Sequence, residues 1–418
     1  MKKTWKFLWI KIIILIIGSG LLFYFFFEDL RFEILGSAIG MMLTVVGADF
    51  VTSLLILREE KIKLISSKFT YDEVFYRKKF KINGKETDIW YDAIEYEGDP
   101  VYTVEDDPTK QFTLDSIIQN NFGEIMQAHL ASFIANPMMI RLDDCKREAD
   151  GTVKLFTSRT AFYNDLVTNR AMDYKFGGDM SVREIYENGR YLSPLGSSKM
   201  SNHIGFGAFI FYGNSMIVAH RGGNATLSKN QFTAALAFGF SEDDLRKVHD
   251  PLGSEQKAAE RFPVLTADDL LVGILLVRMG DALNMPIPRV RELYEQKKIT
   301  IHTLGFGQLI YTGGKPQFYF AIVIDKSVDL CPQKDKQQIR EQKKKIDFNK
   351  NMVFADGIEL VKEGGHVLRL KKSGTDKTVK GEAEKSFFVN YWHLLARPRI
   401  EGVPDWVYEN SDIQARSE

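Results

Sequence analysis

Cysteine is almost absent from this sequence: Cys145 and Cys331 are the only two among 418 residues. They are far apart and lack the spacing of metal ligands, which argues against a disulfide framework and favours a reducing compartment. A net charge is absent as well, because 55 basic residues balance 55 acidic ones. A chain without an overall positive field is not expected to bind DNA.

The common motifs of several enzyme classes are also missing. The sequence contains no G-x-S-x-G, no H-E-x-x-H and no Walker phosphate loop. Standard serine hydrolases, zinc metalloproteases and P-loop nucleotidases are therefore not expected, and we predict no metal and no cofactor. What the chain does have is 44% hydrophobic residues, enough for a sizeable core in two or three domains.

Two long apolar runs stand near the N-terminus, at residues 7–27 and 34–57. Each is close to the roughly 20 residues that cross a bilayer as a helix. Basic residues flank the pair on both outer sides, which by the positive-inside rule places both termini in the cytoplasm. We predict a two-helix transmembrane hairpin within residues 1–60, in a bacterial inner membrane. A cleaved signal peptide is the alternative for the first run, but a second long run follows at once.

Three residues of the second run are candidates for a function in the membrane. Gly36 and Gly40 form a G-x-x-x-G, whose small residues let helices pack closely. Asp49 lies within the span, where a carboxylate is costly unless it is paired, wetted or protonated. It would line a pore or a subunit contact, or else lie near enough to the headgroups to reach water. The predicted partners of this part are the lipid bilayer and further copies of the chain.

The rest of the chain divides into two predicted parts. Residues 61–139 form a coupling region of mixed structure with an amphipathic helix at 114–135. Residues 140–418 contain two predicted hairpins, one turning at Gly213-Asn214 and the other at "TGGKP". The apolar helix "ADDLLVGILLVRMGDALNM" separates them, and "KSFFVNYWHLLA" is a closing helix. This order predicts an α+β fold in which strands and helices pack as a sandwich.

Four stretches of the C-terminal part resemble one known family. They are "SRTAFYNDLVTN" (158–169), "PLGSSKMSNHIGFGAFIF" (194–211), "LAFGFSEDDL" (236–245) and "GFGQLIYTGGKPQF" (305–318). They are similar to the Nudix-fold domain associated with bacterial cGAS-like nucleotidyltransferases, and the resemblance covers roughly residues 140–398. Preceded by two membrane spans, that domain is an effector type in cyclic-oligonucleotide anti-phage signalling (CBASS).

The resemblance implies a Nudix-like α/β/α sandwich at residues 140–418 that binds a cyclic di- or trinucleotide. It also implies a functional link to a cGAS-like nucleotidyltransferase, which would supply that ligand. Ligand binding would promote homo-oligomerisation of the transmembrane hairpins and disrupt the inner membrane, so that the infected cell dies (abortive infection). The implied protein is a receptor and effector of antiviral defence.

A working Nudix box places glutamates on one helix face, where they hold magnesium against a diphosphate. Over "RELYEQKKI", Arg291, Glu292 and Glu295 fit this box, but Gln296 replaces a carboxylate. Over "RMGDALNM", apolar residues fill all three glutamate positions. The box is broken in both registers, so we predict no catalytic residues and a domain that holds a nucleotide without cutting it. "RELYEQKK" is then a short solvated helix that begins at Pro288.

Candidate ligand contacts follow from the chemistry of nucleotides. Phosphates bind cationic side chains and backbone amides of glycine-rich turns, and bases stack on aromatic rings. The cationic candidates are Arg221 and Lys315, the polar ones are Ser201, Asn202 and Ser241, and the aromatic ones are Phe238, Phe240 and Phe318. The alternative for each is an ordinary structural role.

Two other functions remain open at this point. One is a membrane-anchored Nudix hydrolase of nucleoside diphosphate derivatives, with Glu292 and Glu295 as catalytic residues and a further carboxylate from Glu242, Asp243 or Asp244. The other is an interaction module without a small ligand. Magnesium-dependent turnover would distinguish the first, and the absence of any nucleotide binding the second.

Overall fold

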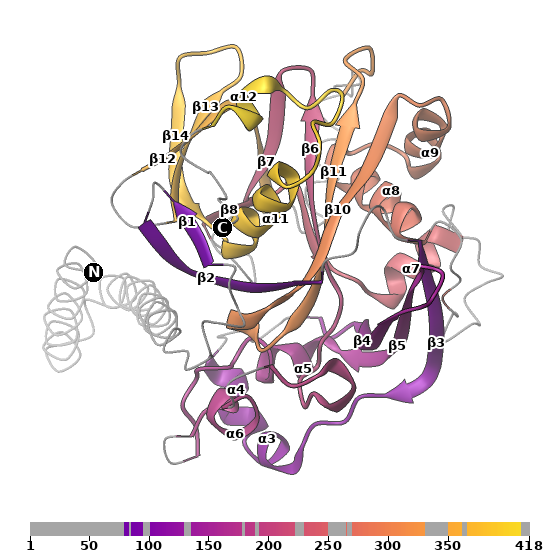
Figure 1. The fold of residues 1–418 in the computed structure, drawn as a ribbon, viewed down its shortest axis with the longest axis vertical. Helices are drawn as coiled ribbons and strands as arrows, with labels where there is room; N and C mark the ends of the chain where they lie inside the picture. Colours follow the sequence, from indigo (N-terminus) through magenta and orange to yellow (C-terminus); the bar gives the residue numbers. More distant parts are fainter. Residues whose placement is uncertain are drawn as a thin grey trace, which may run out of the picture. The chain divides into compact units, whose positions relative to one another are not determined.

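The computed structural model describes most of the chain after residue 100 and two strands before it (Figure 1). The described residues are 79–82, 85–94, 101–128, 135–177, 180–188, 192–221, 230–249, 265, 270–330, 350–361 and 366–410. The chain divides into two compact units, and nearly all described residues belong to the second, Ser67–Met126 with Ala131–Glu418.

An eleven-stranded sheet forms the centre of this unit. Ten strands follow in the order β1 (Lys79–Ile82), β2 (Lys85–Ile94), β10 (Ile299–Leu309), β11 (Lys315–Ile324), β6 (Gly205–Tyr212), β7 (Ser215–Arg221), β12 (Lys350–Leu360), β13 (Val367–Lys372), β14 (Thr378–Ala383) and β8 (Gln231–Ala234), and β9 (Leu236–Gly239) pairs with β6. The pairs β11–β6 and β14–β8 are parallel, and the other neighbours are antiparallel. Both predicted hairpins, β6–β7 and β10–β11, are confirmed.

Helices cover both faces of the middle of this sheet. Successive residues of a strand point to opposite faces, and β11 is buried along almost its whole length. On one face, Phe318 and Phe320 pack with α8 (Leu270–Leu283) and α9 (Ile287–Glu295). On the other face, Tyr319 packs with α11 (Lys385–Leu395). The sheet therefore separates two apolar cores. Figure 1 shows α8 and α9 on one side of its central strands and α11 on the other.

A small sheet lies at one end of the large one. Its order is β3 (Tyr102–Gln111), β5 (Val153–Ala161) and β4 (Met138–Arg147). Its strand β4 is tied to the segments that precede β6 and follow β9, because Ile140 N donates to Phe240 O (2.9 Å) and Leu142 N to Asn202 O (3.1 Å). β4 begins before residue 140 and β2 pairs with β10, so both sheets include strands from the predicted coupling region.

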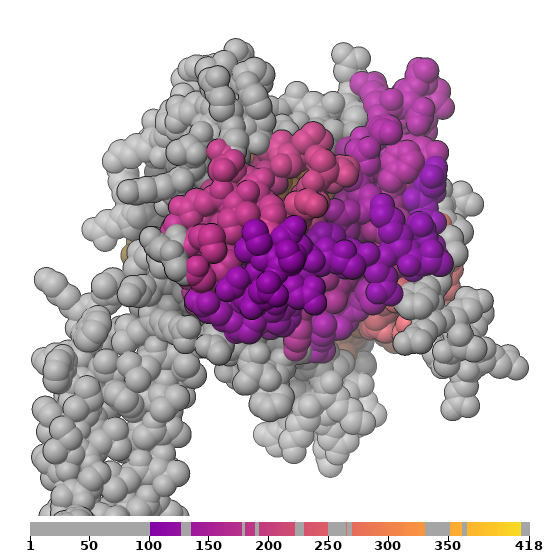
Figure 2. Space-filling model, turned by 90° about the horizontal axis from the view of Figure 1, so that it is seen from below, coloured from indigo at the N-terminus to yellow at the C-terminus, as the bar shows by residue number. Residues whose placement is uncertain are grey.

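Short helices complete this end of the unit. They are α3 (Ser116–Asn120), α4 (Phe122–Ala128), α5 (Phe162–Val167) and α6 (Val182–Tyr186), with α7 (Glu242–His249) and α12 (Asp405–Tyr408) elsewhere. Helices α3 to α6 share a third apolar core, and the indigo and magenta residues in Figure 2 form the surface there. The predicted helix at 114–135 is broken at Asn121, whose Nδ2 donates to Ile117 O at 2.8 Å. Such side-chain bonds to the backbone compete with helix continuation.

The membrane part of the predicted fold is corrected. Among the residues that the structure describes, no helix is long and apolar enough to cross a membrane. The longest, α8, has 14 residues and rises about 21 Å, against a hydrocarbon core of roughly 30 Å. The predicted hairpin at residues 1–60, with Gly36, Gly40 and Asp49, lies outside the described residues. We therefore correct the fold class to a mixed α/β fold with large sheets, and we withdraw the predicted inner-membrane localisation.

Gly305 is expected to be a sensitive position of the large sheet. It lies at a bulge of β10, and a Cβ atom there would stand 2.6 Å from Cε1 of His393, which stacks on Tyr319. Gly305→Ala should therefore lower the free energy of unfolding by about 1–3 kcal/mol, because the core is already filled. Gly357→Ala is the matched control, since it lies at a bulge of β12 with its nearest neighbour 3.8 Å away. Unfolding in urea measures both variants, and an equal loss of unfolding free energy in Gly305→Ala and Gly357→Ala would contradict this prediction.

Candidate functional site

A buried polar cluster lies where β6 and β11 begin. Because these strands are parallel, their first residues meet at the same end of the sheet. Lys315 is the first residue of β11 and His203 comes two residues before β6, while Asp165 lies on α5 and Arg170 follows that helix. Lys315 and His203 are each 2% exposed, and Asp165 is fully buried. We call these four residues the Lys315 cluster.

Four contacts between nitrogen and oxygen or nitrogen atoms, 2.7 to 3.5 Å long, connect the members of the Lys315 cluster. Lys315 Nζ lies 2.7 Å from His203 Nε2 and 3.4 Å from Asp165 Oδ2. Asp165 Oδ1 lies 3.5 Å from His203 Nδ1, and Arg170 Nε lies 3.4 Å from Asp165 Oδ2. An ammonium group only donates, so Nε2 of His203 accepts from Lys315 and Nδ1 holds the proton that faces Asp165.

Burial sets the protonation of the Lys315 cluster. It lowers the pKa of Lys315 to about 7, although the charge of Asp165 acts in the opposite direction. It also lowers the pKa of His203 to about 3, so this ring is neutral. Burial alone would raise the pKa of Asp165, but His203, Lys315 and Arg170 together hold it at about 2. Lys315 is thus the member of the cluster that changes its charge near neutral pH.

Ser201 and Asn202 lie in the segment that leads to His203. Asn202 has a left-handed backbone (φ 46°), a conformation that asparagine adopts more readily than most residues. Asn169 Nδ2 donates to Asn202 Oδ1 at 3.0 Å and to Thr312 O at 2.9 Å, and Asn202 N donates to Asn169 Oδ1. Ser201 Oγ lies 2.9 Å from Thr160 Oγ1. These bonds fix the path of the chain into β6.

The residue that precedes α11, Glu384, lies near the same cluster. As the N-cap residue of α11, it makes no side-chain capping hydrogen bond and interacts electrostatically with both Lys315 and Arg170. The first N–H groups of a helix favour an anion. Two cationic side chains, Lys315 and Arg170, and two carboxylates, Asp165 and Glu384, therefore lie near one another at the end of the sheet where α11 begins.

The three predicted stacking residues surround one core ring. The ring centroids of Phe238, Phe240 and Phe318 lie 5.1, 5.8 and 5.9 Å from that of Phe206. Phe240 and Phe318 are buried, and Phe238 is half-buried beneath the guanidinium of Arg278 at 4.8 Å. These rings pack with one another on the face of the sheet that α8 covers.

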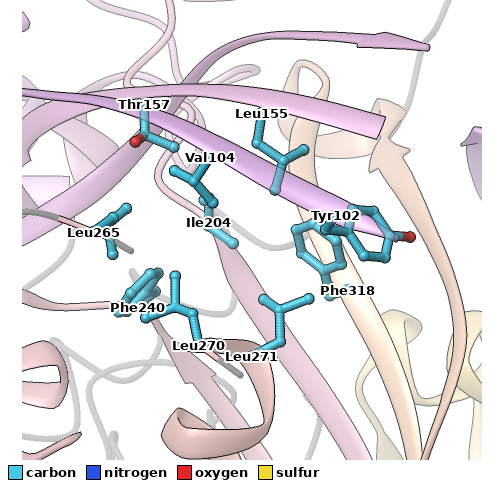
Figure 3. A pocket seen from close by; sticks show the side chains of 10 residues that line it. All are labelled: Tyr102, Val104, Leu155, Thr157, Ile204, Phe240, Leu265, Leu270, Leu271 and Phe318. Carbon is cyan, nitrogen blue, oxygen red and sulfur yellow. The ribbon is translucent and has the colours of Figure 1, made fainter. Parts of the chain in front are cut away.

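Phe240 and Phe318 also line a cavity of about 20 Å³ (Figure 3). The side chains that line it are apolar apart from the hydroxyl groups of Tyr102 and Thr157. The hydroxyl group of Thr157 donates to Asp106 Oδ1 at 2.7 Å. The other lining residues are Val104, Leu155, Ile204, Leu265, Leu270 and Leu271. This volume is about that of one water molecule, so it does not accommodate a nucleotide base.

Ser241 and Arg221 have local partners away from the Lys315 cluster. Ser241 Oγ accepts from Asp244 N at 3.3 Å and Ser241 N donates to Asp244 Oδ2 at 2.9 Å, which forms a capping box at the start of α7. Arg221 Nη2 donates to Ala237 O at 2.7 Å. Of the eight predicted ligand contacts, the structure therefore brings Lys315 together with the Ser201–Asn202 segment and places the others elsewhere.

Four of the five carboxylates of the predicted hydrolase alternative, Glu242, Asp243, Asp244 and Glu292, are paired with separate cations. Glu292 Oε2 lies 2.6 Å from Arg289 on the exposed face of α9, and Glu242 Oε1 lies 2.7 Å from the buried Arg159. Asp244 pairs with an arginine of α8 at 2.6 Å. Within the described residues, no group of three or more His, Cys, Asp or Glu side chains could hold a metal. The predicted short helix at "RELYEQ" is confirmed as α9.

Sequence reasoning missed three members of the Lys315 cluster: Asp165, Arg170 and His203. They lie in or beside stretches that the family resemblance singled out, so that resemblance was the available signal. No spacing rule connects them, because Lys315 is 112 residues from His203 and 150 from Asp165. The parallel pairing of β6 with β11 brings them together.

Comparison of the chain with known proteins found no matching protein-family model and no similar curated protein. The observations on which a function can be proposed are therefore the Lys315 cluster, the helix terminus beside it and the resemblance of the sequence stretches.

Proposed function

We propose that the described domain binds a cyclic di- or trinucleotide through its phosphates and does not hydrolyse it. The observation that supports this function most strongly is the position of Lys315. Its ammonium group lies near Arg170 and the N-terminus of α11, and an anion that binds there would interact with all three. The pairing of Glu242 and Glu292 with arginines supports binding without metal-dependent cleavage.

We further propose that the ligand is the product of a cGAS-like nucleotidyltransferase and that the domain acts as a sensor in anti-phage signalling. This part rests on the sequence resemblance alone. A ligand changes an assembly only by binding its states with different affinity, so the sensor is expected to change its homo-oligomeric state when the nucleotide binds. Light scattering with and without the ligand measures that change, and an unchanged mass would contradict it.

The charges of the site make binding dependent on pH. Lys315 and Arg170 already face two carboxylates, Asp165 and Glu384. A phosphate adds negative charge and favours the ammonium form of Lys315, so the complex takes up a proton where free Lys315 is partly neutral. Affinity should therefore fall as the pH rises above about 7.

Thermal unfolding of the 418-residue chain with cyclic and linear nucleotides tests the function. A ligand at a hundred times its Kd stabilises by about 2.7 kcal/mol. We expect a shift with one cyclic nucleotide that needs no magnesium and leaves the ligand intact. Lys315→Met should abolish it, and Lys326→Met, which changes an exposed lysine, should retain it.

Three results would contradict the proposal. An equal shift in Lys315→Met would exclude the Lys315 cluster as the phosphate site. A magnesium-dependent shift with cleavage of the ligand would favour the hydrolase alternative. No shift with any nucleotide would favour an interaction module without a small ligand.

A further inference from the structure

Tyr311 is a half-buried tyrosine in the turn that leads to Lys315. It belongs to η4 (Ile310–Thr312), the short 3₁₀-helix between β10 and β11. Arg183 Nη2 donates to the carbonyl oxygen of Tyr311 at 3.1 Å, and Asp173 pairs with Arg183 Nε at 2.6 Å. These buried bonds hold in place the backbone that carries the Tyr311 ring.

Two cations that solvent can reach lie near the side chain of Tyr311. Lys385, the partly exposed first residue of α11, has its Nζ over the ring, 5.3 Å from the ring centroid. Arg170, whose side chain is 21% exposed, interacts electrostatically with Tyr311. Because a lysine ammonium stands on a flexible stem, a planar group can take its place over the ring without the movement of a helix or strand.

Lys385 also gives this end of the sheet an excess of positive charge. The cations Lys315 and Arg170 lie near two carboxylates. Asp165 and Glu384 supply those carboxylates, so the four charges balance. Lys385 is a third cation and has no such counterpart in this balance. Since Lys315 is only 2% exposed, an incoming phosphate meets Lys385 and Arg170 first.

We propose that Tyr311 stacks on a base of the bound nucleotide and that Lys385 and Arg170 bind its phosphate. A nucleotide carries a planar ring and a negative charge, and proteins bind it with aromatic faces beside cationic side chains. The base takes the position of the Lys385 ammonium over the ring, which frees that ammonium for the phosphate. The three phenylalanines predicted to stack instead pack with one another on the α8 face of the sheet. This assignment deepens the proposed function and rests on it.

Calorimetry of the 418-residue chain with cyclic diadenylate, cyclic diguanylate and cyclic triadenylate tests the stacking. For whichever of the three binds the wild type most tightly, Tyr311→Leu should raise the Kd by about 5- to 150-fold, because it removes the ring face. Tyr311→Phe keeps that face and should bind nearly as tightly as the wild type.

Tyr408→Leu is the matched control for the loss of the ring. Tyr408 is also half-buried against the second apolar core and lies beneath a cation, Arg399, again at 5.3 Å. Its helix α12 lies at the other end of β6, because Trp406 Nε1 donates to Asn214 O in the turn after that strand. This variant should melt at a lower temperature, as Tyr311→Leu should, but keep the wild-type Kd.

The phosphate contact has a separate test. Lys385→Met should raise the Kd and weaken its dependence on salt, because one cationic contact is lost and exposed charges are screened by salt. Tyr311→Leu should leave the salt dependence unchanged, since stacking involves no ion pair. Lys326→Met, which changes an exposed lysine, should change neither quantity.

Each other outcome overturns a defined statement. If a cyclic nucleotide binds the wild type and Tyr311→Leu equally, or if Tyr311→Phe or Tyr408→Leu loses as much affinity as Tyr311→Leu, the stacking role is excluded and nucleotide binding stands. If Lys385→Met keeps both the affinity and its salt dependence, Lys385 does not bind the phosphate. If none of the three nucleotides binds the wild type, the proposed function fails and this assignment fails with it.

Discussion

Replacing Arg159 with methionine is expected to lower the free energy of unfolding by about 3–5 kcal/mol. Arg159 is fully buried and joins three elements: its Nη1 and Nη2 lie 2.7 and 2.8 Å from the two oxygens of Asp106 on β3, and its Nε lies 2.7 Å from Glu242 on α7. Methionine fills a similar volume but leaves two buried carboxylates without their cation. The urea midpoint of the 418-residue chain measures the loss.

Arg246→Met is the matched control for this prediction. Arg246 approaches the same carboxylate, Glu242, but at 3.9 Å and with half of its side chain exposed. An exposed ion pair contributes about 0–1 kcal/mol, so this variant should unfold near the wild-type midpoint. If the two variants lost the same stability, the buried pairing of Arg159 with Asp106 would not be the source of the effect.

The stability difference between the wild type and Lys315→Met should change with pH. The pKa of Lys315 is about 7 in the folded chain, below its ordinary value of 10.5. Between these values the unfolded wild-type chain binds more protons than the folded one, so the wild type, which carries the lysine, gains stability as the pH rises. One proton corresponds to at most about 1.4 kcal/mol per pH unit. Methionine does not titrate, so the difference isolates this group.

We expect the difference to increase in favour of the wild type from pH 7 to pH 9 and to be flat below pH 6. The other members of the cluster do not change charge there, because the pKa of Asp165 is about 2 and that of His203 is about 3. Unfolding of the wild type and of Lys315→Met in urea at several pH values measures this stability difference. Lys326→Met should show no such slope, and a flat profile for Lys315→Met would mean that Lys315 stays charged in the folded chain.

Local sequence chemistry predicted the local parts of this fold. Gly213-Asn214 and the "TGGKP" stretch supply the turns of β6–β7 and β10–β11, and Gly213, Gly313 and Gly314 all adopt positive φ. The strands β12 to β14 and the pairing of β2 with β10 were not predicted, because they depend on contacts between distant segments. The transmembrane hairpin was predicted from the apolar composition of residues 1–60, and these residues lie outside the part of the chain that the structure describes.

The candidate site shows the same division. Lys315 was predicted because a lysine in a glycine-rich turn is typical of phosphate sites, and its neighbours Asp165 and His203 come from elsewhere in the chain. Phe318 was predicted to stack on a base, whereas alternation along β11 directs it into the core beside Phe206. A strand buried on both faces gives no sequence signal for which of its aromatic residues is accessible.

The parallel pairing of β6 with β11 has a consequence for how the chain folds. Gly205 pairs with Gln317, and the intervening segment contains β7 to β10 with α7 to α9. Contacts between residues so far apart cost loop-closure entropy before they stabilise anything, so folding is slow when they form the centre of a sheet. During synthesis, β6 therefore lacks its parallel neighbour until more than a hundred further residues have been added, and in that interval it is a strand edge exposed to other chains.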